Sequence, residues 1–215
     1  MAGTRRLSLT FDNGPDPSVT HEVLDALAER SLPATFFAVG AKARGAGREA
    51  LLRAREAGHA VGNHTMHHTR LASLTAEEID EEIEAAQRAL AGVAGPDRLF
   101  RPAGSGGHLG PDTLPPAAVA HLVRHSYTCV LWNAVPRDWE DPVGWVDTAL
   151  EQVAAHDWTV LVLHDLPTGA MDRLPAFLDG VLAAGVQVVE GFPDDCTPIR
   201  DGARTGPLPG EVTTR

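Results

Sequence analysis

Short apolar runs alternate with segments of helical periodicity along the whole chain, and this alternation restricts the fold more than any other feature. The apolar runs lie at 7–11, 34–39, 59–62, 99–101, 127–132, 159–164 and 186–189, and their length and composition predict β-strands. The helical segments lie at 19–30, 48–57, 76–91, 116–124, 143–155 and 174–184. Strands and helices that alternate with short loops predict a parallel sheet, and about seven such units favour a closed or nearly closed α/β barrel.

Local signals support the boundaries of several helices. Thr75 followed by Glu78 predicts a capping box at the start of the 76–91 helix. Gly58 and Gly185 stand immediately after predicted helices and before predicted strands, where a residue in the left-handed conformation commonly ends a helix.

The chain is predicted to form one domain followed by a tail. Its 215 residues suit a single core, which we place at 1–196. Residues 197–215 are rich in Pro, Gly and Thr and predict an extended or frayed tail. No window resembles a membrane span, and no apolar segment of signal-peptide length precedes the first predicted strand. We therefore expect a cytoplasmic protein without a membrane partner, unless a leader was removed.

The charge and cysteine content restrict the partners and the redox chemistry. The formal net charge of -11 and the scattered arginines disfavour nucleic acid and acidic polymers. The chain has 2 cysteines, and Cys129 falls inside an apolar run, which predicts a buried thiol rather than a disulfide. The oligomeric state stays open.

Two polar runs at the ends of predicted strands carry the residue types of a metal site. The run 10–15, Thr-Phe-Asp-Asn-Gly-Pro, ends a strand with Asp12 and Asn13 before a turn. About fifty residues later, His64 and His68 stand at i and i+4, the spacing that places two imidazoles on one face of a helical turn. Two imidazoles and one oxygen donor predict an open metal site.

Five runs together resemble the polysaccharide deacetylase family, also called the NodB homology domain or carbohydrate esterase family four. The first two runs are similar to the family's TFDDGP and H-[ST]-x-x-H motifs. The other three similar runs are 100–102, Trp132-Asn133 with Asp138-Trp139, and 161–165. The resemblance implies a distorted (β/α)7 barrel, in agreement with the alternation. All five runs fall at or just after the carboxyl ends of predicted strands, which is the catalytic face of such a barrel.

The resemblance implies the roles of the metal-site residues. His64, His68 and Asn13 are the implied metal ligands, and Asp12 is the implied general base that deprotonates the attacking water. His67 is an alternative ligand that we expect to be supporting or exposed.

The resemblance also implies an acid and its partners. His164 would protonate the leaving amine, with Asp138 holding the imidazole charged and oriented. Arg101 would pair with Asp12 and fix its orientation. Asp165 would point away from His164 if the strand continues.

The groove residues are predicted in part from the resemblance and in part from this chain's departures from it. Trp139 would wall the groove, and Leu163 with Leu161 would help to form an apolar pocket for an acyl methyl group. The third motif lacks the family's usual aromatic residue, which predicts a small, flexible loop there. A backbone N–H of Ala103 or Gly104 would contact the oxyanion.

Asn13 stands where the family usually has a metal-binding aspartate. A neutral amide compensates the charge of an ion less than a carboxylate does, so we expect weaker metal affinity with activity retained at saturating metal. The same Asp-Asn-Gly variation occurs in a branch of the family that resembles the muramic acid deacetylases.

The resemblance implies a metal-dependent hydrolase of non-peptide carbon–nitrogen bonds. We expect a deacetylase that removes acetyl from an N-acetylated amino sugar or oligosaccharide, with zinc favoured over cobalt or manganese. Two alternatives stay open: a cytoplasmic hydrolase of a small non-sugar amide such as a cyclic imide or ureide, and a metal-free carbohydrate-binding relative. The retained acid–base residues argue against the second alternative.

Overall fold

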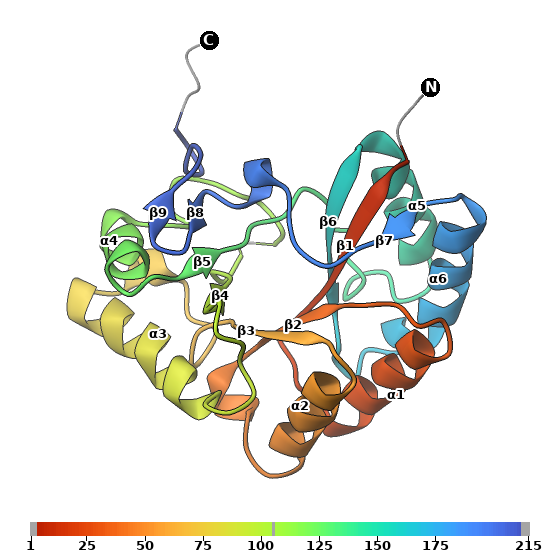
Figure 1. Cartoon of the computed structure of the whole chain (residues 1–215), viewed down its shortest axis with the longest axis horizontal. Coiled ribbons are helices and arrows are strands. Elements are labelled where there is room, and N and C mark those ends of the chain that lie inside the picture. The colour runs from red at the N-terminus through yellow and green to blue at the C-terminus, as the bar shows by residue number, and fades with distance from the viewer. Residues whose placement is uncertain (1–3, 105, 212–215) are drawn as a thin grey trace.

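A curved, mostly parallel sheet runs through the molecule, and the helices lie on its outer side (Figure 1). The computed structural model describes residues 4–104 and 106–211. Within these residues the strand order is β6-β1-β2-β3-β4-β5-β8-β9, and β7 pairs with the start of β1. The strands are β1 (Arg6–Asp12), β2 (Thr35–Ala38), β3 (Ala60–Asn63), β4 (Leu99–Phe100), β5 (Thr128–Cys129), β6 (Trp158–His164), β7 (Gln187–Val188), β8 (Ile199–Arg200) and β9 (Ala203–Arg204).

The sheet forms a half-barrel. Its order ends at β6 on one side and at β9 on the other. A parallel bridge between Ala134 and Leu161 joins the segment after β5 to β6, and the Val162 N–H donates to the Ala134 carbonyl at 3.0 Å. The predicted fold class, an α/β protein with a distorted (β/α)7 barrel, is therefore confirmed, and strands β1 to β7 each overlap one predicted segment.

The helices begin and end close to their predicted positions. The α-helices are α1 (Pro17–Ala28), α2 (Ala46–Glu56), α3 (Ala76–Ala89), α4 (Pro116–Arg124), α5 (Trp145–Ala155) and α6 (Leu174–Ala183), and the 3-10 turns are η1 (Gly40–Lys42), η2 (Leu71–Ser73), η3 (Ala170–Arg173) and η4 (Asp194–Cys196). The capping box of Thr75 and Glu78 is present at the start of α3. Gly58 and Gly185 follow α2 and α6 with φ of 92° and 69°, as helix-ending residues do.

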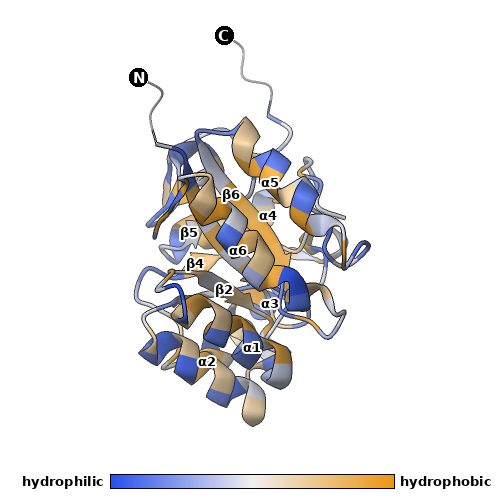
Figure 2. Ribbon diagram, turned by 90° about the vertical axis from the view of Figure 1, so that its right-hand side faces the viewer, coloured by the Kyte–Doolittle hydropathy of each residue, from blue (hydrophilic) through white to orange (hydrophobic). Residues whose placement is uncertain are grey.

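Successive side chains of β1 and β6 point alternately to an outer core and to the interior of the barrel. Leu9 and Phe11 of β1 and Leu163 of β6 pack outward into the cluster formed with α1, α5 and α6. Val160 and Val162 of β6 lie in a separate interior cluster. Figure 2 shows β6 as an apolar strand behind α6. The side chains that share the interior face with Val162 include His164, so this alternation determines which residues reach the site.

The predicted tail is wrong in its first part, because the sheet continues past residue 196. Thr197 and Ile199 are fully buried, and β8 pairs with β5 in antiparallel orientation through Ile199 and Cys129. An otherwise unpaired edge of β5 explains this pairing, since an edge strand exposes backbone donors and acceptors. The sheet thus crosses the boundary predicted at residue 196, and residues 212–215 lie outside the described part. Among the described residues, no helix has both the length and the apolar character needed to span a membrane.

Asp165 follows β6 and turns away from His164, toward α1. Its Oδ2 accepts a hydrogen bond from the Thr20 hydroxyl. The carboxyl group also lies against Gly14, where an added Cβ would come within 2.1 Å of Oδ1. Burial raises the pKa of Asp165 to about 7. The predicted orientation of Asp165 is confirmed, and its carboxyl links the end of β6 to α1.

This raised pKa predicts a pH dependence of stability that Asp165→Asn removes. Between pH about 4 and about 7 the folded state binds more protons at Asp165 than the unfolded state, so the free energy of unfolding falls as pH rises. Relative to the variant, the wild type should lose up to about 1.4 kcal/mol per pH unit across this window. Urea unfolding of both proteins at several pH values measures it. A stability difference that stays constant with pH would contradict the assignment.

Candidate active site

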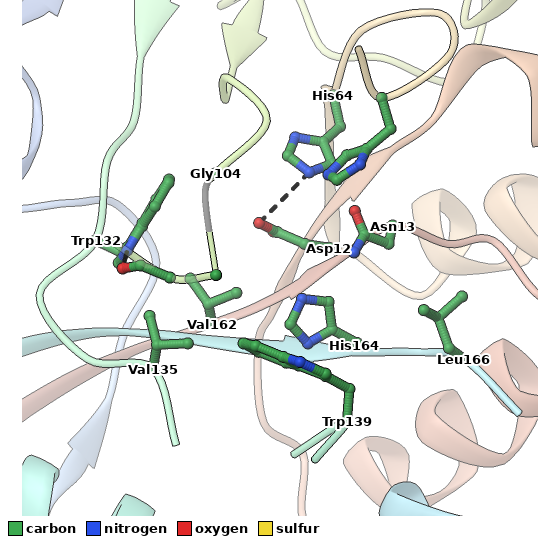
Figure 3. Close-up of a pocket in the computed structure, with 13 residues that line it drawn as sticks. Asp12, Asn13, His64, Gly104, Trp132, Val135, Trp139, Val162, His164 and Leu166 are labelled. Atoms are coloured by element: carbon green, nitrogen blue, oxygen red, sulfur yellow. Dashed lines mark hydrogen bonds and ion pairs between the residues drawn. The ribbon is translucent and has the colours of Figure 1, made fainter. Parts of the chain in front are cut away.

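The pocket lies at the carboxyl ends of the parallel strands, on the face predicted to be catalytic. Asp12 ends β1 and His164 ends β6, and the two are direct partners in the register of these strands. Figure 3 shows Asp12 between His64 on one side and His164 on the other. The cavity has a volume of about 350 Å³. It is lined by Asp12, Asn13, His64, His68, Gly104, Gly106, Gly107, Trp132, Val135, Trp139, Val162, His164 and Leu166.

Arg101 is fully buried behind Asp12 and holds it by a short ion pair. The Arg101 Nη1 lies 2.8 Å from Asp12 Oδ1 and also donates to the Thr10 hydroxyl at 2.6 Å. The remaining donors of the guanidinium reach the carbonyls of Val130 at 3.1 Å and Leu131 at 3.3 Å. The structure therefore brings the predicted pair together. The pairing engages one oxygen of Asp12, and the other, Oδ2, lies 3.7 Å from His64 Nε2.

His64 and His68 come together as neutral imidazoles. Their ring centroids are 4.8 Å apart. The Nδ1 of His64 lies 2.9 Å from the Arg101 carbonyl. Because a carbonyl only accepts, this Nδ1 carries the proton and leaves a lone pair on Nε2. Burial lowers the pKa of His64 to about 4, and burial also lowers the pKa of His68, so both rings are in the form that can bind a metal.

The helical turn predicted to join these two histidines is wrong. Thr65 and His68 have φ of 64° and 59°, so the segment is a loop with two left-handed residues. Asn63 at the end of β3 starts this loop, because its Oδ1 accepts from the Thr65 N–H at 2.8 Å. The same i, i+4 spacing thus brings the rings together through a tight turn instead of a helix.

Glu82 of α3 anchors the histidine loop, and the sequence interpretation missed it. Its carboxylate accepts from the His67 N–H at 2.6 Å and lies 2.9 Å from His67 Nδ1, and its backbone carbonyl accepts from the Met66 N–H at 3.0 Å. Burial would raise the pKa of Glu82, but its hydrogen bonds with His67 outweigh this and lower the pKa, which keeps the carboxylate ionised. The signal in the sequence was an acid on the apolar face of α3, beside Ile79 and Ile83.

His67 points out of the site, as predicted for a supporting or exposed residue. Its side chain is 64% exposed while it contacts Glu82. This contact uses Nδ1, and His67 does not line the pocket.

The side-chain oxygen of Asn13 is buried without a hydrogen-bond donor among the described residues. The backbone of Asn13 is left-handed, with a φ of 70°. In the same part of the chain, no three His, Cys, Asp or Glu side chains converge as metal ligands. An unpartnered amide oxygen beside two neutral imidazoles is of the right chemical type to be a third donor to a metal ion. The residues present therefore fit a divalent ion.

Asp138 holds His164 through two contacts. Its Oδ1 lies 2.8 Å from His164 Nδ1, and its Oδ2 accepts from the His164 backbone N–H at 3.0 Å. Burial lowers the pKa of His164, but the hydrogen bond and charge of Asp138, with smaller contributions from Asp12 and Asp165, outweigh it and raise the pKa above its usual value. Trp139 packs edge-on against this imidazole, with ring centroids 4.8 Å apart. The predicted acid, His164, therefore lies against Trp139, the residue predicted to line the groove.

Three residues predicted to line the groove, Leu161, Leu163 and Ala103, do not reach it, and Leu161 packs in the outer core with Leu163. Leu163 points outward into the core, because strand alternation gives its neighbours Val162 and His164 the interior face. The apolar wall comes instead from Val162 and Leu166. Ala103 lies in a separate hollow behind the loop, whereas Gly104 lines the pocket as predicted.

Trp132 supplies the aromatic surface that the third motif lacks. A Cβ added at Gly104 would lie 3.1 Å from its ring, so the missing side chain leaves room for this indole. Trp132 Nε1 donates to the Gly107 carbonyl at 2.8 Å, and Arg137 donates to the Gly106 carbonyl at 2.9 Å. The glycine loop is therefore held by side chains on both sides.

One paired carboxylate, one paired imidazole and two neutral imidazoles in one pocket are groups chemically suited to activating water for hydrolysis. The sequence model of the polysaccharide deacetylase family matches residues 2–114, more than half of the chain. A chitooligosaccharide deacetylase from Sinorhizobium fredii is 34% identical over 204 residues, which are 89% of this chain and 87% of that protein. The chain belongs to the polysaccharide deacetylase family and is a hydrolase of non-peptide carbon–nitrogen bonds.

Solved structures share the fold of this chain. A T48 deacetylase solved with substrate is 30% identical, with a TM-score of 0.70 over 86% of this chain and 88% of that chain. A family 4 acetyl xylan esterase from Clostridium thermocellum, solved with a cobalt ion, shares the fold at 24% identity, with a TM-score of 0.71 over 86% and 87%.

Glu82→Gln should loosen the histidine loop. The variant loses the charge that strengthens the hydrogen bonds to His67, so we expect a loss of about 1.5 kcal/mol or more in the free energy of unfolding. The matched control is Glu81→Gln, since Glu81 forms an exposed ion pair with Arg88 and should change stability by less than about 0.5 kcal/mol. Urea unfolding and hydrogen exchange at the His67 amide measure both effects. Equal losses in the two variants would refute the anchoring role.

Asp138→Asn should lower the pKa of His164. The substitution removes the carboxylate that raises this pKa and leaves the effect of burial, so His164 should lose its proton at a lower pH than in the wild type. An NMR titration of the ring measures the change. Asp147→Asn, which removes an exposed acid of α5, provides the control and should leave the titration in place. A His164 titration unaffected by Asp138→Asn would contradict the pairing.

Proposed function

We propose that the protein is a divalent-metal-dependent deacetylase that removes the acetyl group from an N-acetylated amino sugar or oligosaccharide. The observation that carries this proposal is the pairing of Asp12 with Arg101 and of His164 with Asp138 on opposite sides of one pocket. The names of the Sinorhizobium fredii relative and of the T48 deacetylase support the substrate class and the reaction.

Asn13, His64 and His68 are the residues that would hold the ion. Neutral imidazoles favour zinc, with cobalt or manganese as substitutes, and the cobalt ion of the acetyl xylan esterase supports a divalent ion in this family. Bound there, the ion supplies Lewis-acid activation of a carbonyl and lowers the pKa of water.

Asp12 acts as the general base. Arg101 fixes the carboxylate from behind through Oδ1 and is itself held by the Thr10 hydroxyl, which leaves Oδ2 to accept the proton of the attacking water. Because Arg101 is fully buried, Asp12 cannot rotate away without leaving an unpaired charge.

His164 acts as the general acid. Asp138 holds one proton on Nδ1 and raises the pKa, so the charged ring can give its Nε2 proton to the leaving amine. We assign Gly104, in the facing loop, as the backbone donor to the oxyanion. The proposed base and acid thus lie on neighbouring strands. Asp12 takes the proton from the attacking water, and His164 gives a proton to the leaving amine.

The pocket wall favours a sugar over a charged substrate. Trp132 and Trp139 present aromatic surface, and Val135 and Val162 add apolar surface for an acetyl methyl and for C–H faces of a sugar ring. The cyclic imide or ureide alternative has no support among the relatives described above, and we do not propose it. The complete acid–base set argues against the metal-free binding alternative.

Asp12→Asn should separate catalysis from metal binding. The variant keeps all three proposed ligands, so it should bind one zinc ion per chain while losing about two to four decades in rate, as expected for a lost general base. His64→Ala should instead lose both the metal and turnover. Acetate release from N-acetylglucosamine oligomers and the zinc content of the dialysed proteins measure these outcomes. Wild-type rates in Asp12→Asn, or full activity of His64→Ala in the presence of a chelator, would contradict this mechanism.

A further inference from the structure

The segment 39–42, between β2 and the end of η1, links the two loops that carry the proposed metal ligands. Three of its links are made by consecutive backbone N–H groups and the fourth by the Lys42 side chain. The contacts are Val39 N to Gly14 O at 2.9 Å, Gly40 N to Thr65 O at 2.9 Å, Ala41 N to Met66 O at 2.9 Å, and Lys42 Nζ to Asn13 O at 2.7 Å. The segment therefore connects the Asn13 loop to the loop of His64 and His68.

Close packing fixes the backbone of this segment. A Cβ added at Gly40 would come within 2.7 Å of Met66 Sδ and 2.8 Å of Ala86 Cα of α3. No residue larger than glycine fits there, so the three backbone links hold a fixed position. Lys42 is exposed, and its ammonium group makes the one link that a substitution can remove without disturbing the packed backbone.

We propose that Lys42 is a positioning residue that fixes Asn13, so that the orphaned Oδ1 of Asn13 stays at the metal site. Asn13 has a left-handed backbone, which asparagine adopts more readily than most residues, so the conformation of this loop depends on the contacts that hold it. The ammonium group of Lys42 holds the Asn13 carbonyl, next to the Gly14 carbonyl that accepts from the Val39 N–H. The inference rests on the proposed function, because it takes Asn13 as a metal ligand.

Positioning and simple electrostatics predict opposite effects of removing Lys42. A positive charge near a cation site repels the ion, so its loss would strengthen zinc binding if Lys42 acted by charge alone. Loss of positioning frees the Asn13 loop and weakens zinc binding. The sign of the change in affinity therefore separates the two roles.

The experiment is a calorimetric titration of metal-free protein with Zn²⁺ at fixed ionic strength. Lys42→Met should bind zinc roughly tenfold more weakly, as expected for the loss of one charge-assisted hydrogen bond. Lys42→Arg keeps a donor of the same charge and should recover most of the affinity. Arg44→Met is the matched control, because Arg44 is exposed two residues further on and its loss changes the net charge equally; its zinc affinity should match or slightly exceed that of the wild type.

A second background tests whether Lys42 acts through Asn13. In an Asn13→Ala protein, Lys42→Met should no longer weaken zinc binding, since the ligand that it positions is gone. The inference is overturned if Lys42→Met binds zinc as tightly as the wild type, or if it weakens binding equally in both backgrounds. A wild type that binds no zinc would overturn the proposed function and this inference with it, whereas a wild type that binds zinc with no loss in Lys42→Met overturns this inference alone.

The chain offers a chemical version of the same test. Lys42 is the only lysine in the sequence, so reductive methylation or acetylation of amino groups reaches Lys42 and the N-terminus. Methylation keeps the charge and should preserve most of the zinc affinity, whereas acetylation removes the charge and should weaken binding as Lys42→Met does. Equal zinc affinity after both treatments would contradict the proposal.

Discussion

The buried ion pair between Arg101 and Asp12 is the interaction on which the rest of the site depends. The guanidinium follows β4, and its donors reach β1 through Thr10 and Asp12 and the segment after β5 through two carbonyls. It therefore links β1 to β4 and to the segment after β5, and neither β4 nor β5 pairs with β1 in the sheet. The Arg101 carbonyl also accepts from His64 Nδ1 and so sets the tautomer of that ring. Removal of either charge would leave the other buried and unpaired, which is strongly destabilising.

The site uses histidine in two electrostatic environments. Around His64 and His68, burial dominates and the rings stay neutral with a lone pair available. At His164 burial acts in the same direction, but Asp138 outweighs it and the ring holds its proton more tightly. The two environments lie close together, because Asp12 Oδ2 is 3.7 Å from His64 Nε2 and Asp12 is the direct register partner of His164. One residue type thus occurs in one cavity both as a neutral ring with a free lone pair, as the proposed ligands require, and as a ring with a raised pKa, as the proposed acid requires.

The sequence predicted the strands and helices well because short apolar runs alternate with segments of clear helical period. It also placed Asp12, His164 and Arg101 at strand ends. It failed where a side chain's direction depends on register: Leu163 was assigned to the pocket, although His164 on the same strand already fixed the interior face at even positions. The residue of β6 that lines the pocket beside His164 is Val162 rather than Leu163.

Other features could not be derived from local pattern. The turn that joins His64 to His68 depends on left-handed backbone and on Glu82, which lies in a helix that begins several residues later. Pairing of β8 with β5 depends on an unpaired edge far away in the sequence, which the composition of residues 197–215 does not reveal. The link from Lys42 to Asn13 likewise appears only when the loop after β2 is folded against the loop after β1. These contacts are tertiary, and spacing alone does not contain them.

The measurement that tests the account most directly is anomalous diffraction at the zinc absorption edge from crystals of the protein grown with zinc. The account predicts a single strong peak in the pocket, within bonding distance of Asn13 Oδ1 and of one ring nitrogen each of His64 and His68, with Asp12 still paired to Arg101. A peak that Asn13 does not touch, an ion that draws Asp12 away from Arg101, or a pocket without a peak at saturating zinc would contradict it.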